Sequence, residues 1–208
     1  MSPQTTAPVL LLAAGALLAA CALHAADVRT YYVEPCTRPE TACHAGDPQL
    51  AQWAIEAWQK ASAGGLKLER VARREDAQIR ILWSDGLHGQ YGETMPIMVA
   101  GKRGAEVHVR PDMTQLGPDI SAATRADALL RDAIVYLTCL HESGHALGLP
   151  HTGAFADIMY TFQLGGDISE YFGRYRRKLA TRADIARNSG LSDADRAKLL
   201  DIVKTEQF

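Results

Sequence analysis

The stretch HESGHALGLPH, residues 141–151, determines how the rest of this chain is interpreted. Residues four apart lie on one face of a helix, so His141 and His145 can direct their imidazoles at one metal ion, with Glu142 beside them. Gly148 can end the helix in the left-handed conformation, which lets His151 approach the same ion from another direction. Three neutral nitrogen ligands leave the fourth position of a zinc ion open for water, as in catalytic sites.

The same residues match a family pattern. The sequence resembles the metzincin metallopeptidases, whose HExxHxxGxxH motif and methionine turn correspond here to His141, Glu142, His145, Gly148, His151 and Met159. The resemblance implies that Met159 packs beneath a zinc ion without ligating it. Tyr160 follows the methionine directly, as in the matrixin branch, and is expected to shape the wall of the substrate pocket. Thr161 stands where some other branches place a tyrosine ligand.

The motif is predicted to lie on a long helix. A stripe of apolar residues with helical spacing leads into it: Ala126, Leu129, Leu130, Ala133, Ile134, Leu137 and Leu140. Thr124 is predicted to cap this helix, with Asp127 three residues on as in a capping box. Cys139 is expected to be a small core residue that points away from the metal. Histidines that only face solvent or the core are the alternative, but three of the seven in the chain fall in this one window.

The remaining elements predict an α+β fold. Strands are expected at residues 28–34, 66–71, 77–83, 94–99 and 105–109. A helix is expected from Asp47, as its cap, to Gly64, and a last helix after Ser192. This order resembles the small matrixin catalytic domain, which implies a twisted, mostly parallel sheet with an antiparallel edge strand, an active-site helix and a carboxy-terminal helix. The candidate for the edge strand is 94–99.

One segment departs from the compact matrixin layout. Residues 165–190 are long for a connection and rich in arginine. They predict an extra helix or a lid near the substrate pocket. A basic run is, however, also typical of a solvated surface, and this alternative stays open.

Residues 1–26 are predicted to be an export signal, and residues 27–208 a single catalytic domain. The run from 9 to 20 contains only apolar residues and glycine, and it is short for a membrane span but typical of a secretory signal. No Lys or Arg precedes this run, which weakens the assignment. A buried amino-terminal helix is the alternative, although the run has no amphipathic pattern.

The end of this signal has two interpretations. Residues 18–21 (LAAC) resemble a bacterial lipobox, which would make Cys21 the lipidated first residue of the mature protein. Cleavage by an ordinary signal peptidase at or just before Ala26 is less favoured, because Leu23 and His24 fit poorly where small residues are required. The protein is therefore expected to be exported, and to stay in the periplasm or cell envelope if lipid-anchored, or to be secreted.

Two cysteines and two histidines outside the motif are further candidates for metal ligands. Cys36 and Cys43 are close in sequence, flanked by Pro35, Pro39 and Gly46, and are expected to close a small disulfide loop in an oxidising compartment. A metal site at these cysteines is disfavoured, because neither has a His or Cys partner at zinc-finger spacing. No cysteine is placed as in a propeptide that blocks the zinc. His88 and His108 are interpreted as surface or strand residues, because an isolated histidine is a weak metal signal. The sequence therefore supports one catalytic Zn²⁺ and neither calcium nor a second zinc.

These observations predict a zinc-dependent endopeptidase that acts on proteins or peptides by metal-activated water, with Glu142 as general base. The composition, 47% hydrophobic and 22% charged, is that of a soluble globular domain, and the net charge of -2 argues against nucleic-acid binding. A monomer is expected. The alternatives are hydrolysis of small peptides or other amides, and a membrane-anchored binding module that keeps its zinc without turnover.

Overall fold

The computed structural model describes residues 26–85 and 91–205, in which five strands form one sheet with the order β2-β1-β3-β5-β4. The strands are β1 (Asp27–Val33), β2 (Leu66–Arg70), β3 (Ile79–Trp83), β4 (Gly92–Val99) and β5 (Lys102–Val109). The pairs β1–β2, β1–β3 and β3–β5 are parallel, whereas β4 pairs antiparallel with β5 and forms one edge. The predicted α+β fold and its antiparallel edge strand are confirmed.

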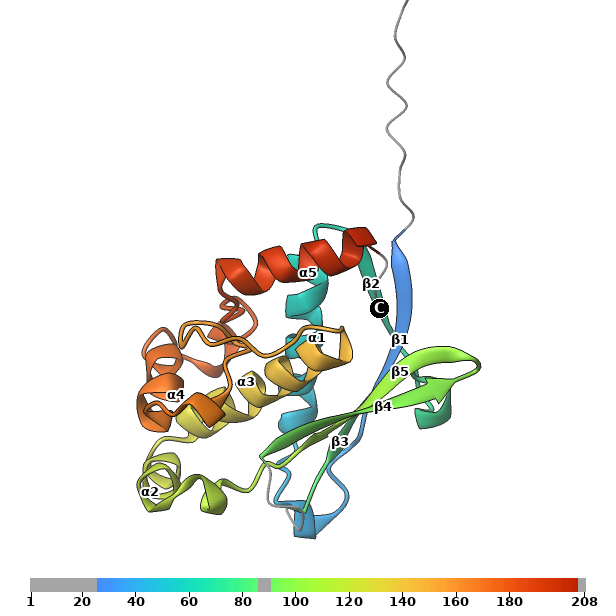
Figure 1. Ribbon diagram of the computed structural model, residues 1–208. Helices are drawn as coiled ribbons and strands as arrows, with labels where there is room; N and C mark the ends of the chain where they lie inside the picture. Colours follow the sequence, from blue (N-terminus) through green and yellow to red (C-terminus); the bar gives the residue numbers. More distant parts are fainter. Residues whose placement is uncertain (1–25, 86–90, 206–208) are drawn as a thin grey trace, which may run out of the picture.

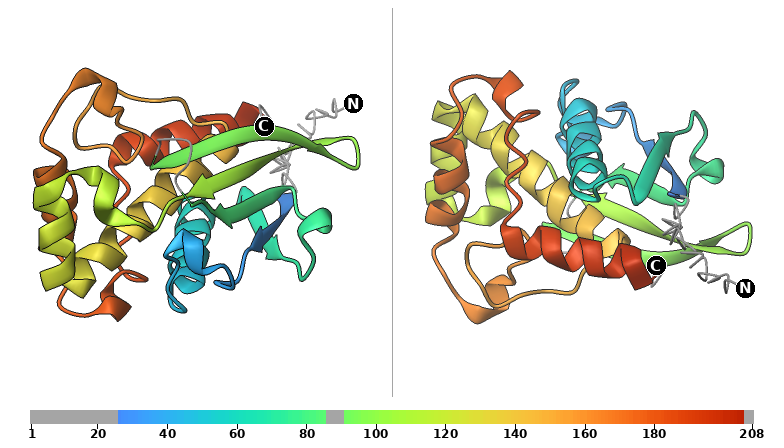
Figure 2. Two further views of the ribbon diagram at one scale, coloured as in Figure 1. Left: turned by 90° about the horizontal axis from the view of Figure 1, so that it is seen from below. Right: turned by 90° about the horizontal axis from the view of Figure 1, so that it is seen from above.

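Five α-helices gather on one side of this sheet (Figure 1). They are α1 (Asp47–Ala61), α2 (Pro118–Ala126), α3 (Ala128–Ala146), α4 (Ile168–Arg176) and α5 (Asp193–Thr205). Helix α3 packs against α1 and against β3, β4 and β5. Two further views show that β4 and β5 extend past the other strands as a long hairpin (Figure 2). Within the described ranges, every helix is too short or too polar to cross a membrane.

The core lies between the sheet and the pair α1 and α3. Alternate strand residues point into it, and Ile79 and Ile81 of β3 and Val107 of β5 are fully buried there. Trp58 of α1 is also fully buried, and its indole N–H donates to the carbonyl oxygen of Leu140 at 2.9 Å. This bond fixes α1 against α3 one residue before the histidine motif.

Helix α1 begins one residue earlier than predicted, because Gly46 and not Asp47 is its cap. The carboxylate of Asp47 is almost fully buried and forms two hydrogen bonds, of 2.6 and 2.7 Å, with the guanidinium of Arg131 on α3. A buried carboxylate needs a charged partner, so the tertiary contact determines the role of this side chain. The predicted cap is therefore wrong, although the helix itself is confirmed.

Helix α3, in contrast, begins later than predicted. Thr124 lies inside α2, where its hydroxyl donates to the carbonyl oxygen of Ile120 at 2.9 Å. Asp127 is the cap of α3, and its carboxylate accepts from the amides of Leu129 and Leu130 at 3.0 and 3.1 Å. An aspartate can serve either at the cap or three residues into a helix. The predicted cap at Thr124 is thus wrong, because the chain breaks at Asp127 into two helices.

The arginine-rich segment 165–190 contains the extra helix α4, which packs against α3. The guanidinium of Arg174 lies 4.4 Å from the ring centre of Tyr171, and Arg176 pairs with the cap residue Asp127 at 2.8 Å. Arg177 is exposed and pairs with Glu170. The alternative of a solvated basic face therefore holds for only part of this segment.

Candidate metal centre and active site

The three histidines of the motif converge at the carboxyl end of α3. His141 and His145 lie one turn apart on the helix, and the Nε2 atom of His151 lies 3.3 Å from Nε2 of His141 and 3.0 Å from Nε2 of His145. Gly148 has a φ of 89° and donates to the carbonyl oxygen of His145. Leu149 donates to the carbonyl oxygen of Gly144, which completes the two-bond pattern that ends many helices. The left-handed glycine thus turns the chain back toward the ligand face.

Backbone carbonyls hold two of the imidazoles in one orientation. Nδ1 of His141 lies 2.6 Å from the carbonyl oxygen of Ile158, and Nδ1 of His145 lies 2.8 Å from that of Leu149. Because a carbonyl oxygen only accepts, each Nδ1 carries the proton, and each Nε2 presents its lone pair to the centre. Burial lowers the pKa of His141 to about 4, and burial also lowers the pKa of His145. Both rings are therefore neutral near pH 7, as metal ligands must be.

This donor set fits a zinc ion. One ligand nitrogen from each of the three histidines lies within 4.8 Å of the other two. Imidazole nitrogens suit zinc, and three of them leave one coordination position for water or substrate.

Met159 is 1% exposed and packs against α3 at Gly144, between His141 and His145. A Cβ atom added to Gly144, inside the motif, would come within 2.5 Å of the sulfur of Met159 and 2.9 Å of the Trp58 ring. A side chain at position 144 would therefore force Met159 or Trp58 to shift. That Met159 lies beneath a zinc ion stays a prediction, and the close approach of Met159 to Gly144 leaves no signal in the sequence.

Asp195, at the start of α5, binds the backbone of the methionine turn. The sequence alone did not indicate this role. Its buried carboxylate accepts from the amide of Ile158 at 2.9 Å and from that of Met159 at 3.4 Å. It also accepts from the amide of Ser192, whose hydroxyl accepts from the amide of Asp195 at 3.0 Å. The predicted cap at Ser192 is confirmed. The spacing S-x-x-D predicts such a cap, but it contains no signal for the bonds to the methionine turn.

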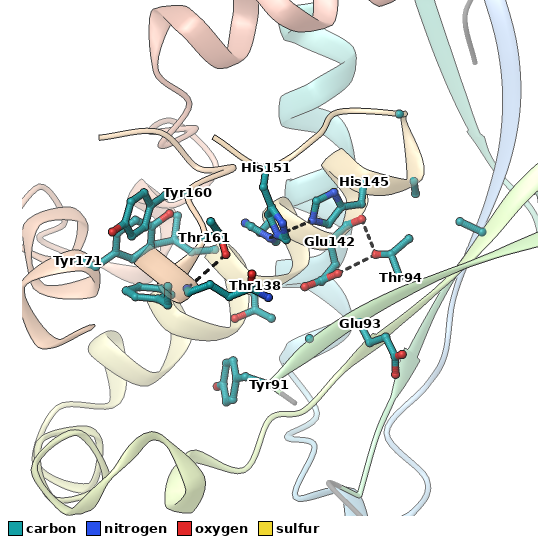
Figure 3. Close-up of a pocket in the computed structure, with 18 of the residues that line it drawn as sticks. Tyr91, Glu93, Thr94, Thr138, Glu142, His145, His151, Tyr160, Thr161 and Tyr171 are labelled. Carbon is teal, nitrogen blue, oxygen red and sulfur yellow. Dashed lines mark hydrogen bonds between the residues drawn. The ribbon is translucent and has the colours of Figure 1, made fainter. Parts of the chain in front are cut away.

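Glu142 lies between the histidines and the edge strand β4 (Figure 3). It is 7% exposed, and its carboxylate Oε2 lies 2.7 Å from the hydroxyl of Thr94. Burial raises the pKa of Glu142 to about 7, while the hydrogen bond from Thr94 opposes the rise and the charge of Glu93 adds to it. A carboxyl of this kind can hold or release a proton near neutral pH.

A cavity of about 880 Å³ connects these groups. Its aromatic end is formed by Tyr160, Phe162, Tyr171 and Phe172, whose rings contact one another, and Tyr91 and Thr161 also line the cavity. Tyr160 is held there by a hydrogen bond of 2.9 Å from its hydroxyl to the carbonyl oxygen of Gly165. Helix α4 supplies part of this wall, so the segment 165–190 does reach the pocket, as one of its two interpretations anticipated. The lining also includes Arg29 of β1 and Arg103 of β5.

The other sequence-predicted ligand candidates lie elsewhere. Cys36 and Cys43 form the predicted disulfide, and Asp47 beside them is bound to Arg131, so this group does not fit a metal ion. Cys139 is fully buried and free. His108 lies on β5 near Glu106, with 3.6 Å between its Nε2 and Oε2. His88 and Cys21 lie outside the described residues.

Comparison with known proteins agrees with this geometry. A protein-family model for matrixins, peptidase family M10, matches residues 25–167. The matched range contains the whole sheet, the three histidines and the methionine turn, and it ends before α4 and α5. A comparison with curated proteins gave no match. Because the family model covers more than half of the chain, the chain belongs to the matrixin family of zinc metallopeptidases.

Proposed function

We propose that this protein is a zinc-dependent endopeptidase that hydrolyses peptide bonds of protein substrates, with Glu142 as general base. The observation that carries the proposal is the position of the Glu142 carboxylate, which lines the same cavity as the three converging histidines. His141, His145 and His151 would hold one zinc ion. When bound, zinc would supply an activated water molecule and polarise the substrate carbonyl.

Glu142 is suited to carry a proton between two positions. With a pKa of about 7, its carboxyl group can accept a proton from the attacking water and release it to the departing amine. A nucleophilic serine or cysteine is not needed for this chemistry. The free thiol of Cys139 is fully buried, and burial raises its pKa well above the ordinary value, so it has no part in the reaction.

The edge strand β4 is the proposed binding surface for the substrate backbone. It is the last strand in the sheet order and borders the cavity through Gly92, Glu93, Thr94 and Pro96. The free edge of a strand can pair with an extended peptide. We infer that the substrate lies extended along β4, with the bond to be cut beside Glu142.

The aromatic end of the cavity is the proposed pocket for one substrate side chain. Tyr160, Tyr171 and Phe172 are each less than 7% exposed and offer apolar surface to the cavity. Tyr160 would then shape this pocket and not touch the metal. Its hydroxyl is engaged by Gly165, so an apolar side chain matches the wall better than a charged one.

Export and a monomeric state are proposed on sequence grounds. Residues 1–25, which include all but the last residue of the proposed signal 1–26 and the lipidation candidate Cys21, lie outside the described part of the chain. The disulfide between Cys36 and Cys43 supports an oxidising compartment such as the periplasm, the cell envelope or the exterior. The intact mass of the mature protein distinguishes a lipidated Cys21 from cleavage near Ala26.

The test compares wild type with Glu142→Gln on unfolded protein substrates in the presence of zinc. Glu69→Gln, at an exposed glutamate on β2, is the matched control. We expect cleavage by wild type and by the control, and a loss of at least about 100-fold in the Glu142 variant. Cleavage of short peptides or simple amides alone would favour the small-substrate alternative. If wild type binds zinc but cleaves none of these substrates, the chain is a binding module and the proposal is wrong.

A further inference from the structure

The carboxylate of Glu142 is held by a residue of another element. The hydroxyl of Thr94, on β4, lies 2.7 Å from Oε2 of Glu142 and 2.9 Å from the carbonyl oxygen of the same residue. Figure 3 shows Thr94 directed from the edge strand at Glu142, on the side away from His151. Both acceptors belong to Glu142, so the one hydroxyl proton binds this residue whichever acceptor it takes.

The same hydroxyl suits both forms of the carboxyl group. When Oε2 is ionised, it accepts the Thr94 proton in a charge-assisted hydrogen bond. When Oε2 carries the proton taken from the attacking water, it becomes a donor, and Oγ of Thr94 can accept from it. Thr94 can then turn its own proton to the carbonyl oxygen of Glu142 at 2.9 Å. In either form the hydroxyl of Thr94 thus has a hydrogen-bond partner on Glu142.

A second residue of β4, Gly92, also packs against the Glu142 side chain. A Cβ atom added to Gly92 would lie 2.5 Å from Oε1 of Glu142 and 2.7 Å from its Cγ. Side chains at 92 and 94 point to the same face of a strand, so both residues meet Glu142 from one direction. The backbone at Gly92 thus packs against one carboxylate oxygen while Thr94 binds the other.

We propose that Thr94 is a positioning residue that, together with Gly92, fixes the carboxylate of Glu142 for proton transfer. This inference rests on the proposed peptidase function. Because β4 is also the proposed partner of the substrate backbone, one strand would align both the base and the scissile bond. The pairing of substrate with β4 then sets the distance between the Glu142 carboxylate and the scissile bond. A small change in this distance lowers the reaction rate strongly.

The central variant is Thr94→Val, which has nearly the same shape but no hydroxyl. We expect kcat to fall about 10- to 100-fold with KM changed by less than about twofold, because the lost bond orients the base and does not bind substrate. Thr94→Ser restores the hydroxyl and should recover most of this loss. Gly92→Ala should lower kcat as well, since its Cβ displaces the Glu142 side chain. If Thr94→Val does not fold, Thr94→Ala is measured in its place.

The matched control is Thr30→Val, on β1, whose hydroxyl donates to the carbonyl oxygen of Asp76 at 2.8 Å, away from the site. Two further readouts separate positioning from damage to the metal centre. The affinity for zinc, measured by competition with a chromogenic chelator, should be unchanged in Thr94→Val. Crystal structures of the metal-free proteins should show Glu142 in one rotamer in wild type and Thr94→Ser, and displaced in Thr94→Val.

The outcomes distinguish the two proposals. If wild type is active and Thr94→Val turns over like the Thr30→Val control, the role of Thr94 is overturned while the peptidase assignment stands. Weaker zinc binding in Thr94→Val would also overturn it, because the residue would then act on the metal site. If wild type cleaves no substrate, the peptidase proposal fails. Independently of activity, an unchanged Glu142 rotamer in crystals of Thr94→Val would show that Thr94 does not position the carboxylate.

Discussion

Replacement of Asp195 by alanine tests whether α5 holds the floor of the metal site. The carboxylate of Asp195, on a residue that is 2% exposed, accepts from the amides of Ile158 and Met159 and from the amide of Ser192. The carbonyl oxygen of Ile158 in turn binds Nδ1 of His141. One peptide unit therefore connects a residue of α5 to a predicted zinc ligand.

The expected decrease in the free energy of unfolding follows from the backbone amides that Asp195→Ala leaves without a hydrogen-bond acceptor. Ile158 and Met159 are each at most 2% exposed, so water does not easily replace the carboxylate, and each unpaired amide costs about 1–3 kcal/mol. The amide of Ser192 lies in a half-buried residue and counts less. The expected decrease in the free energy of unfolding is about 2–6 kcal/mol, a large fraction of the total for a domain of this size.

The assay is urea unfolding of the metal-free protein with its disulfide intact, so that zinc binding does not contribute. Asp193→Ala, at an exposed position in the same first turn, is the control, and Asp195→Asn keeps one carbonyl oxygen and should lose less. Zinc affinity should also fall up to about 10-fold through the loosened carbonyl of Ile158. A variant Asp195→Ala within about 0.5 kcal/mol of the control would refute this reasoning.

Three other predictions concern the same site and its support. The pKa of Glu142 is raised from 4.5 to about 7 in the folded metal-free protein. Between pH 4.5 and 7 the folded protein therefore binds more protons at Glu142 than the unfolded chain does, and Glu142 adds stability as the pH falls through this range. The pKa of His141, lowered to about 4 from 6.5, has the opposite effect and removes stability as the pH falls from 6.5 to 4. Glu142→Gln should therefore lose stability relative to wild type by about 1.4 kcal/mol per pH unit from pH 7 to pH 4.5, and parallel curves of urea midpoint against pH would contradict this. Gly144→Ala should destabilise the metal-free protein by about 1–3 kcal/mol because its Cβ overlaps Met159, whereas Gly153→Ala, whose Cβ would meet only Leu164 at 3.4 Å, should have little effect; equal losses would reject the packing explanation. Replacing Cys36 and Cys43 with serine should lower the free energy of unfolding by about 2–3 kcal/mol through the opened loop, and wild type in reductant should match the variant.

Much of the fold could be predicted because its signals are local. Alternating residues in the strands and the apolar stripe before His141 each lie within a few turns of chain, and the structure has elements at nearly the predicted places. The errors are at boundaries. Thr124 and Asp127 both fit a helix start by sequence, and only the break between α2 and α3 decides between them.

In the candidate site, too, local features could be predicted and long-range contacts could not. His141, Glu142, His145 and Gly148 fall within two turns of one helix and its end, so their geometry follows from the helical repeat and a left-handed glycine. The contact of Thr94 with Glu142 joins residues 48 apart in the chain, and that of Asp195 with Ile158 joins residues 37 apart. Neither pair leaves a periodic pattern in the sequence.

By itself the sequence determined the identity and spacing of the candidate metal ligands, the helix that holds two of them and the class of the fold. The tertiary structure alone decided that β4 meets Glu142, that α4 forms part of the wall of the pocket and that α5 supports the methionine turn. The physical reason is the range of the interactions. Local hydrogen bonds and the helical repeat act between near neighbours, whereas these contacts depend on which distant segments the closing of the core brings together.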